Sequence, residues 1–237
     1  MILAVDKPTG MTSYDVIRKL KHLYPKQKIG HSGTLDPLAT GLLLIGIDKG
    51  TKELFRLQGL DKSYEATIDF SQTSDTWDVD FWEIHGQYSV ETNTEGIIGI
   101  VKDDQFIPAP EQLFLEKNIE SIIPEANLPL TPFSAKKKDG KKLYELARAG
   151  EIVDEYRIMK INGYHINEYN FPVMKIRLDV GSGTYIRSIA HRLGKQAHMG
   201  GILTQLRRTC IGNISLENLD LQDLGDSGLK GCEVFLD

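Results

Sequence analysis

The sequence predicts an α+β fold with a mixed, largely antiparallel central sheet and flanking helices. Stretches with strand character outnumber those with helical character. Residues 155–169 and 173–180 are two such stretches separated by a short turn, which is typical of an antiparallel hairpin. Hydrophobic residues make up 41% of the 237 positions, enough for a sizeable buried core.

The first third of the chain alternates strands with one helix. Residues 2–5 form an expected buried strand, and Pro8 and Gly10 impose a turn after it. Ser13 is then placed to cap a helix whose apolar side chains recur at the helical period. Residues 42–47 are a second buried strand. Residues 62–70 alternate apolar with polar side chains, which indicates a half-buried strand.

The remaining elements are expected in the following order. Residues 71–110 are acidic and β-prone, and residues 111–123 are helical up to Pro124. A basic loop runs into a short helix at 143–148, and the hairpin described above follows. Thr184 is placed to cap the last helix, and residues 202–211 form an apolar strand.

Several classes of protein are excluded by what the sequence lacks. The longest nearly apolar stretch, residues 39–47, is too short to cross a membrane, and the first residues do not resemble a secretory signal. Cys210 and Cys232 have no metal-ligand spacing and are expected to be reduced thiols. Neither a P-loop nor a dinucleotide motif occurs. We therefore expect a cytoplasmic protein without a metal or cofactor and without a membrane partner.

The formal net charge of -5 is unevenly distributed. Residues 1–60, 132–160 and 161–210 carry net charges of +4, +3 and +5, whereas residues 61–131 carry -12 and residues 211–237 carry -5. A basic face can therefore exist on an acidic protein.

The segment from Gly30 to Gly41 has the most unusual composition, because glycines surround a single carboxylate, Asp36. Pro37 biases Asp36 away from the helical region, which holds it in an extended or turn geometry. An ordinary Asp-Pro turn would have the same sequence, so the pattern alone does not decide between a turn and a catalytic carboxylate.

A second candidate is Arg187, close to the start of the last helix. The helix dipole disfavours a cation there, so an anion has to compensate the charge. A phosphate or a carboxylate would serve, and Asp36 is one candidate. A solvated arginine on an exposed helix face is the alternative.

Basic residues interleaved with aromatics form a third candidate, an RNA-binding loop, although a solvated loop would look similar. Its residues are Phe133, Lys136, Lys137, Lys138, Lys141, Lys142, Tyr144 and Arg148. Arg207 and Arg208 interrupt an apolar strand, where one should point outward and the other needs a partner. Lys102 and Lys117, in the acidic segment, are expected to contribute little to RNA binding.

In seven places, in the right order, the sequence resembles the TruB family of tRNA pseudouridine(55) synthases. The longest match is residues 30–41, and the resemblance covers the chain from Asp6 to about Leu216. The other matching stretches are residues 6–13, 62–66, 74–78, 140–148, 183–188 and 206–209. The resemblance implies the pseudouridine synthase fold and an isomerase that acts on the T-arm of tRNA.

The resemblance also implies residue roles at the reacting base. Asp36 matches the catalytic aspartate, and Tyr64 matches an aromatic that stacks on the target uracil. Arg187 matches the partner of Asp36, which would keep that carboxylate ionised. His31 matches a residue that enters the T-loop where the flipped base stood.

Supporting roles follow from the same resemblance. Lys7 and Pro8 would brace the site, while Tyr185 and Leu206 would line the pocket. The RNA-binding set is completed by Lys136, Lys137, Lys141, Arg148, Arg207 and Arg208.

The chemistry suits these residue types. Conversion of uridine to pseudouridine breaks a C–N glycosidic bond, rotates the base and joins C5 to the sugar. The reaction needs neither an oxidant nor an energy source, so a single carboxylate that acts as nucleophile or base is enough to catalyse it. The base has to be flipped out of the T-loop to reach it. Two other functions compete with this reading. Intact Asp36, Tyr64 and Arg187 argue against a non-catalytic protein of this fold that binds and remodels tRNA. Phosphoryl transfer through an aspartyl nucleophile would need a metal-binding carboxylate near Asp36, and Leu35 and Pro37 offer none locally.

The expected organisation is one catalytic domain, residues 1–216, with an acidic insertion-like segment at 71–131 and a basic thumb-like loop and helix at 132–150. Residues 217–237 are expected to be an acidic tail, too short for the RNA-binding PUA domain of many relatives. Residues 130–135 depart from the double proline and tyrosine usual before the thumb. We expect a stand-alone monomer whose partner is tRNA, with no obligate protein partner.

Replacement of Lys136, Lys137 and Lys138 together by alanine is predicted to weaken the salt dependence of tRNA binding. Loss of one to three phosphate contacts should flatten the slope of log K against log salt by about 0.7–0.9 per contact. KM should rise more than kcat falls, because phosphate contacts position the RNA. An unchanged slope and KM, measured by filter binding and initial rates, would show that the loop is only a solvated surface.

Overall fold

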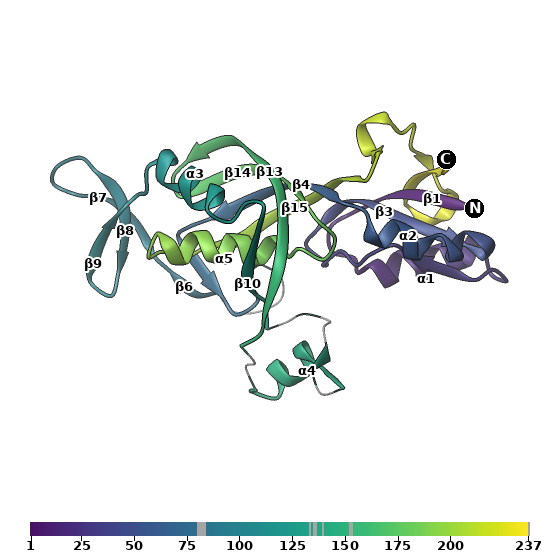
Figure 1. The fold of residues 1–237 in the computed structure, drawn as a ribbon, viewed down its shortest axis with the longest axis horizontal. Helices are drawn as coiled ribbons and strands as arrows, with labels where there is room; N and C mark the ends of the chain where they lie inside the picture. Colours follow the sequence, from purple (N-terminus) through teal and green to yellow (C-terminus); the bar gives the residue numbers. More distant parts are fainter. Residues whose placement is uncertain (80–83, 133, 135–136, 139, 152–153, 237) are drawn as a thin grey trace. The chain divides into compact units, whose positions relative to one another are not determined.

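The computed structural model describes residues 1–79, 84–132, 134, 137–138, 140–151 and 154–236. The chain forms two compact units (Figure 1). The terminal unit comprises Met1–Glu65 and Gln205–Asp237, and the central unit comprises Ala66–Thr204. The chain passes between the units within two strands, β4 (Lys62–Asp69) and β15 (Ile202–Ile211).

The terminal unit contains a mixed sheet in the order β4-β15-β3-β1-β18-β17. Strand β1 is Ile2–Lys7, β3 is Thr40–Ile47, β17 is Gln222–Asp223 and β18 is Lys230–Val234. Two short strands lie off this path: β2 (Ile29–His31) pairs with β3, and β16 (Ile214–Ser215) pairs with β15. β1 is antiparallel to both β3 and β18, whereas β15 runs parallel to β3. The sheet is therefore mixed, as the sequence predicts.

Apolar side chains at the helical and strand periods build the core of this unit. Leu42–Ile45 of β3 are fully buried. Helix α1 (Ser13–Leu23) buries Val16, Ile17 and Leu20 on one face. The helices α2 (Leu54–Gly59), η1 (Asp48–Lys52), η2 (Leu216–Asn218) and η3 (Gly225–Ser227) complete the unit.

The cap of α1 differs from the expected one. Thr12, rather than Ser13, is the N-cap, and it forms a capping box in which Thr12 and Asp15 each accept the other's backbone N–H. Ser13 is buried instead, and its hydroxyl accepts a hydrogen bond from the Leu35 N–H at 2.8 Å. The sequence prediction was wrong by one residue because both Thr and Ser can cap a helix.

The central unit contains a sheet in the order β10-β13-β14-β4-β15. Strand β10 is Glu125–Pro129, β13 is Tyr156–Asn170 and β14 is Val173–Val180, and β13 and β14 form the predicted antiparallel hairpin. Helix α5 (Ile186–Gln196) packs against β10 and against α3 (Gln112–Glu120). Figure 1 shows both helices close to these strands.

The acidic segment forms strands, as its composition predicts. β5 (Gln72–Ser74) pairs with β6 (Ile84–Gln87), and a three-stranded sheet follows, made of β7 (Ser89–Thr92), β8 (Ile98–Lys102) and β9 (Gln105–Pro108). In the basic segment, β11 (Lys137–Lys138) pairs with β12 (Lys141–Lys142), and α4 (Leu143–Arg148) follows. None of the described helices is long and apolar enough to span a membrane.

Two further expectations differ from the structure. The segment 217–237, expected to be an acidic tail, contributes β17 and β18, and Cys232 of β18 lies opposite Ala4 of β1. The N-cap of α5 is Tyr185 rather than Thr184, whose hydroxyl donates to the Lys160 carbonyl. Arg187 is therefore the second helical residue of α5 rather than the third.

Replacement of Gly41 by alanine is predicted to destabilise the protein by at least about 2 kcal/mol. Gly41 has φ +101°, and a Cβ there would lie 2.2 Å from the Arg208 carbonyl oxygen of the neighbouring strand. Urea unfolding measures the effect. Gly59, which ends α2 with open space around it, is the control: its replacement by alanine should change the stability by less than about 1 kcal/mol. Equal unfolding midpoints for the two variants would contradict the predicted clash at Gly41.

Candidate active site

Asp36 lies in the loop between β2 and β3 of the terminal unit. The Ala39 N–H donates to the Asp36 carbonyl at 3.0 Å, so residues 36–39 form a tight turn. Leu35 and Leu38, on either side of the turn's first two residues, are buried. The apolar side chains thus anchor the loop in the core while Asp36 itself stays half-buried.

The connection between β1 and α1 holds the same loop from the other side. The Gly10 N–H donates to the Pro37 carbonyl at 2.9 Å, and the Thr9 hydroxyl donates to the Leu38 carbonyl at 3.2 Å. The bond from Leu35 to Ser13 ties down the residue before Asp36. Hydrogen bonds on both sides of Asp36 therefore fix its backbone.

Lys7, at the end of β1, is completely buried. Its Nζ donates to the carbonyls of Met11 at 2.6 Å, Pro8 at 3.0 Å and Pro37 at 3.3 Å. An ammonium group has three donors, and burying one without partners is very costly. The three carbonyls meet this requirement, and one of them belongs to the residue directly after Asp36.

Arg208, on β15, is also buried, with 2% of its surface exposed. Its Nε donates to the Leu42 carbonyl at 2.7 Å, and its Nη2 donates to the Gly33 carbonyl at 3.3 Å. Arg207 points toward β1, where its two Nη atoms contact the Asp6 carboxylate at 3.0 and 2.8 Å. Both arginines have partners within the terminal unit, and Arg207 retains the greater exposure.

His31 ends β2, where the charge of Arg208 acts on it. Its Nδ1 accepts the Gly33 N–H at 3.3 Å. Burial, and secondly the charge of Arg208, lowers the pKa of His31. The imidazole is therefore neutral at neutral pH, with its proton on Nε2.

Tyr64 and Leu206 lie on the adjacent strands β4 and β15, with 9% and 7% of their surfaces exposed. Two residues before Tyr64, the buried Lys62 donates its Nζ to the carbonyls of Gln58 and Leu60 at the end of α2. Burial, with a smaller contribution from Arg208, lowers the pKa of Lys62 to about 8. These bonds attach the strand that carries Tyr64 to α2.

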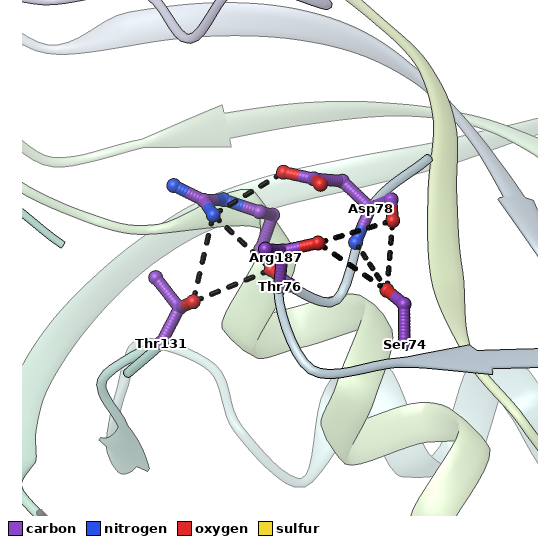
Figure 2. Close-up of polar contacts among 5 residues, drawn as sticks. All are labelled: Ser74, Thr76, Asp78, Thr131 and Arg187. Atoms are coloured by element: carbon purple, nitrogen blue, oxygen red, sulfur yellow. Dashed lines mark hydrogen bonds and ion pairs between the residues drawn. The ribbon is translucent and has the colours of Figure 1, made fainter. Parts of the chain in front are cut away.

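Arg187 is held in the central unit by a cluster of polar groups (Figure 2). Its Nη1 lies 3.2 Å from Asp78 Oδ2, 3.1 Å from the Thr76 carbonyl and 3.5 Å from the Thr131 hydroxyl. Only 7% of the Arg187 side chain and 3% of the Asp78 side chain are exposed. The anion expected from the sequence at this helix start is present, and Asp78 supplies it.

Asp78 was not predicted from the sequence, although it ends one of the matching stretches. Its loop is shaped by Ser74, whose hydroxyl donates to the Asp78 carbonyl at 2.7 Å and accepts the Asp78 N–H at 3.1 Å. These bonds turn the carboxylate toward Arg187 (Figure 2). The signal available in the sequence was the need of Arg187 for an anion, but no local spacing connects the two residues.

The other expected site residues belong to the central unit as well. Tyr185 is half-buried, and its N–H contacts Met159 Sδ at 3.4 Å. Lys137 lies in β11, Arg148 lies in α4, and Lys141 is exposed in β12. Lys136 and Phe133 lie outside the described residues.

Comparison with known proteins identifies the class and the family. Residues 21–186 match the model described as TruB family pseudouridylate synthase (N terminal domain). This match and the relatives described below define the class of protein as a pseudouridine synthase, an isomerase. Within that class, the chain belongs to the TruB family.

Curated relatives of this family align over nearly the whole chain. The tRNA pseudouridine synthase B of Corynebacterium efficiens is 37% identical over 232 residues, which are 95% of this chain and 72% of the relative. The protein of the same name from Flavobacterium johnsoniae is 37% identical over 227 residues, or 92% and 90% of the two chains. The one from Chloroherpeton thalassium is 35% identical over 244 residues, or 98% and 92%.

Solved structures share the fold, which confirms the predicted fold class. A chain of a Cbf5-Nop10-Gar1 complex matches with a TM-score of 0.63 at 22% identity, covering 92% of this chain and 53% of that one. A chain of an H/ACA RNP bound to a substrate RNA containing 2'-deoxyuridine matches with a TM-score of 0.61 at 21% identity, covering 91% and 48%. The chain spans about half the length of these two solved chains.

Replacement of Asp78 by asparagine is predicted to lower the free energy of unfolding by about 3 kcal/mol, because it leaves the buried Arg187 without its carboxylate. Urea unfolding monitored by circular dichroism measures the loss. The matched control is Asp179→Asn, in an exposed ion pair with Arg177 at 3.4 Å, where less than about 1 kcal/mol is expected. Similar losses in both variants would contradict the importance of the buried pair.

Proposed function

We propose that the chain isomerises uridine to pseudouridine at position 55, in the T-arm of tRNA, with Asp36 as the catalytic carboxylate. Membership of the TruB family is the observation that carries the proposal. The relatives named tRNA pseudouridine synthase B support tRNA as the substrate. The hydrogen bonds that fix the backbone around Asp36 support its role, because catalysis requires a group that is positioned in advance.

The reaction needs one carboxylate and a flipped base. The base leaves the stack of the T-loop, and Tyr64 stacks on its uracil ring. Asp36 then attacks the nucleoside or takes a proton from it, so that the bond from N1 to C1' of the ribose breaks. The uracil rotates and C5 forms the new bond to C1', which displaces Asp36 if it had attacked; a proton that it had taken is returned. C5 then loses its proton to water while N1 gains one, so that the reaction is an isomerisation and Asp36 is regenerated. No oxidant or energy source is consumed.

The surrounding residues prepare this step. We propose that Arg187, fixed by Asp78, pairs with Asp36 and orients its carboxylate. His31 enters the T-loop in place of the flipped base, and its lowered pKa suits this role because a neutral ring can stack among bases. Lys7 and Pro8 brace the turn, and Tyr185 and Leu206 line the base pocket.

Phosphate contacts are proposed for the cations of the basic segment. By this proposal the cations of the thumb-like segment, Lys136, Lys137, Lys141 and Arg148, contact the T-arm backbone together with Arg207, of which 39% of the side chain is exposed. Arg208 is proposed to act through the protein instead, because its guanidinium is buried and bonded to two backbone carbonyls. The enzyme acts as a cytoplasmic monomer without an obligate protein partner.

Release of tritium from tRNA labelled at uridine C5 tests the proposal, because formation of pseudouridine transfers that label to water. The wild-type protein should release label from unmodified tRNA, and Asp36→Asn should reduce release at least about a thousandfold while tRNA binding is retained. Asp48→Asn, at an exposed position of the same unit, should keep full activity. A folded wild-type protein that binds tRNA without releasing label would instead be a non-catalytic tRNA-binding protein.

A further inference from the structure

A pocket of about 300 Å³ lies in the central unit, outside the cluster of Arg187 and Asp78. Residues from five parts of the chain surround it: the β5 segment, β8, α5, the turn after α5 and the start of β15. Those used below are Ser74, Trp77, Lys102, His191 and Lys195. Its volume is at the lower end of the range for small-molecule sites.

An aromatic wall forms one side of the pocket. The rings of Trp77 and His191 stack with centroids 4.1 Å apart and planes inclined by 11°. Burial, and secondly the charge of Lys195, lowers the pKa of His191, so its ring is neutral at neutral pH. The same two rings also line a second pocket of about 270 Å³. The stacked pair therefore presents flat, uncharged surface to two adjacent hollows.

Two lysine ammonium groups line the same pocket as these rings. Lys102 and Lys195 both line the first pocket, and Lys195 also lines the second. Among the described residues that line the first pocket there is no aspartate or glutamate, whereas Asp154 lines the second. A cationic pocket with an aromatic wall suits a ligand that carries both an anion and a flat ring.

The pocket is connected to the proposed catalytic machinery. Ser74, which lines it, holds the backbone of Asp78 through the bonds described above. On α5, Arg187, His191 and Lys195 follow one another at intervals of four residues, so they share one face of the helix. This face rises about 12 Å from Arg187 to Lys195. A strand that delivers a uridine to Arg187 can continue along the helix to the pocket.

We propose that this pocket is a second RNA subsite, which takes a single-stranded nucleotide of the substrate beyond the flipped uridine. The base lies against the Trp77–His191 wall, and the phosphate contacts Lys102 and Lys195. The subsite rests on the proposed function for its place in the reaction. It replaces the sequence-based expectation that Lys102 contributes little, because the structure brings Lys102 to the same pocket as Lys195.

Fluorescence of Trp77 reports on the subsite directly. The chain has two tryptophans, Trp77 and Trp82, so Trp82→Phe leaves Trp77 as the single reporter. Titration of this variant with a short oligouridylate should quench its emission, because a base stacks on the indole. Inorganic phosphate serves as the comparison. Equal quenching by phosphate and by the oligouridylate would show a general anion site and overturn the proposal.

The double variant Lys102→Ala, Lys195→Ala, made in the Trp82→Phe background, tests the two ammonium groups. It should weaken oligouridylate binding about tenfold or more and flatten the salt slope by about 0.7 for each lost phosphate contact. The matched control is Lys117→Ala, Lys175→Ala in the same background, two exposed lysines of the same unit outside the pocket. Equal affinities in the two double variants would overturn the proposal.

Turnover of full-length tRNA separates this inference from the proposed function. The double variant Lys102→Ala, Lys195→Ala should raise KM about fivefold or more and change kcat by less than about twofold, because the subsite positions RNA. Quenching without tritium release in the wild-type protein would overturn the proposed function and leave the RNA subsite standing. Normal tritium release without quenching by oligouridylate would overturn the subsite alone.

Discussion

The ammonium group of Lys7, buried and bonded to three backbone carbonyls, is the interaction on which the geometry of the candidate active site depends. A buried cation with several fixed partners admits few arrangements of the surrounding chain. Its partners belong to the β1–α1 connection and to the loop that carries Asp36. One side chain thus holds together two segments that local sequence preferences would leave independent, and Asp36 is fixed as a result.

Buried cations organise the protein in two different ways. Lys7 and Arg208 donate to backbone carbonyl groups, and these bonds fix the backbone closely. Arg187 is satisfied by a carboxylate, that of Asp78, together with a carbonyl and a hydroxyl. The first arrangement shapes loops of the terminal unit. The second compensates and orients a guanidinium at the start of α5, where the helix dipole alone would disfavour a positive charge.

The charge of the chain shows why averages over segments mislead at the scale of a site. Residues 61–131 carry a net charge of -12, yet Lys102 from this segment lines a pocket with Lys195 and no carboxylate among the described lining residues. Asp78 comes from the same segment, and its charge is neutralised by Arg187. What an RNA strand encounters is decided by which side chains are exposed together, and not by the total of the segment.

The sequence by itself determined the local features of the fold, its strands, helices and turns, because these depend on residues close together in the chain. The alternation in residues 62–70, the apolar stripe of α1 and the turn at Asp36 and Pro37 are set by periodicity and by the conformational limits of proline, so the strands, the helix and the turn could be predicted. The choice of Asp36 as the candidate carboxylate came from the resemblance of residues 30–41 to the TruB family. The cap of α1 was misplaced by one residue because Thr12 and Ser13 compete for the same role, and the cap of α5 because the Thr184 hydroxyl donates to the Lys160 carbonyl instead. Only the tertiary structure paired Arg187 with Asp78, brought the Pro37 carbonyl to Lys7 and placed Trp77 on His191. These contacts join residues far apart in the chain, with Arg187 and Thr76 separated by 111 positions. No local pattern encodes them, because they depend on which segments pack together when the core forms.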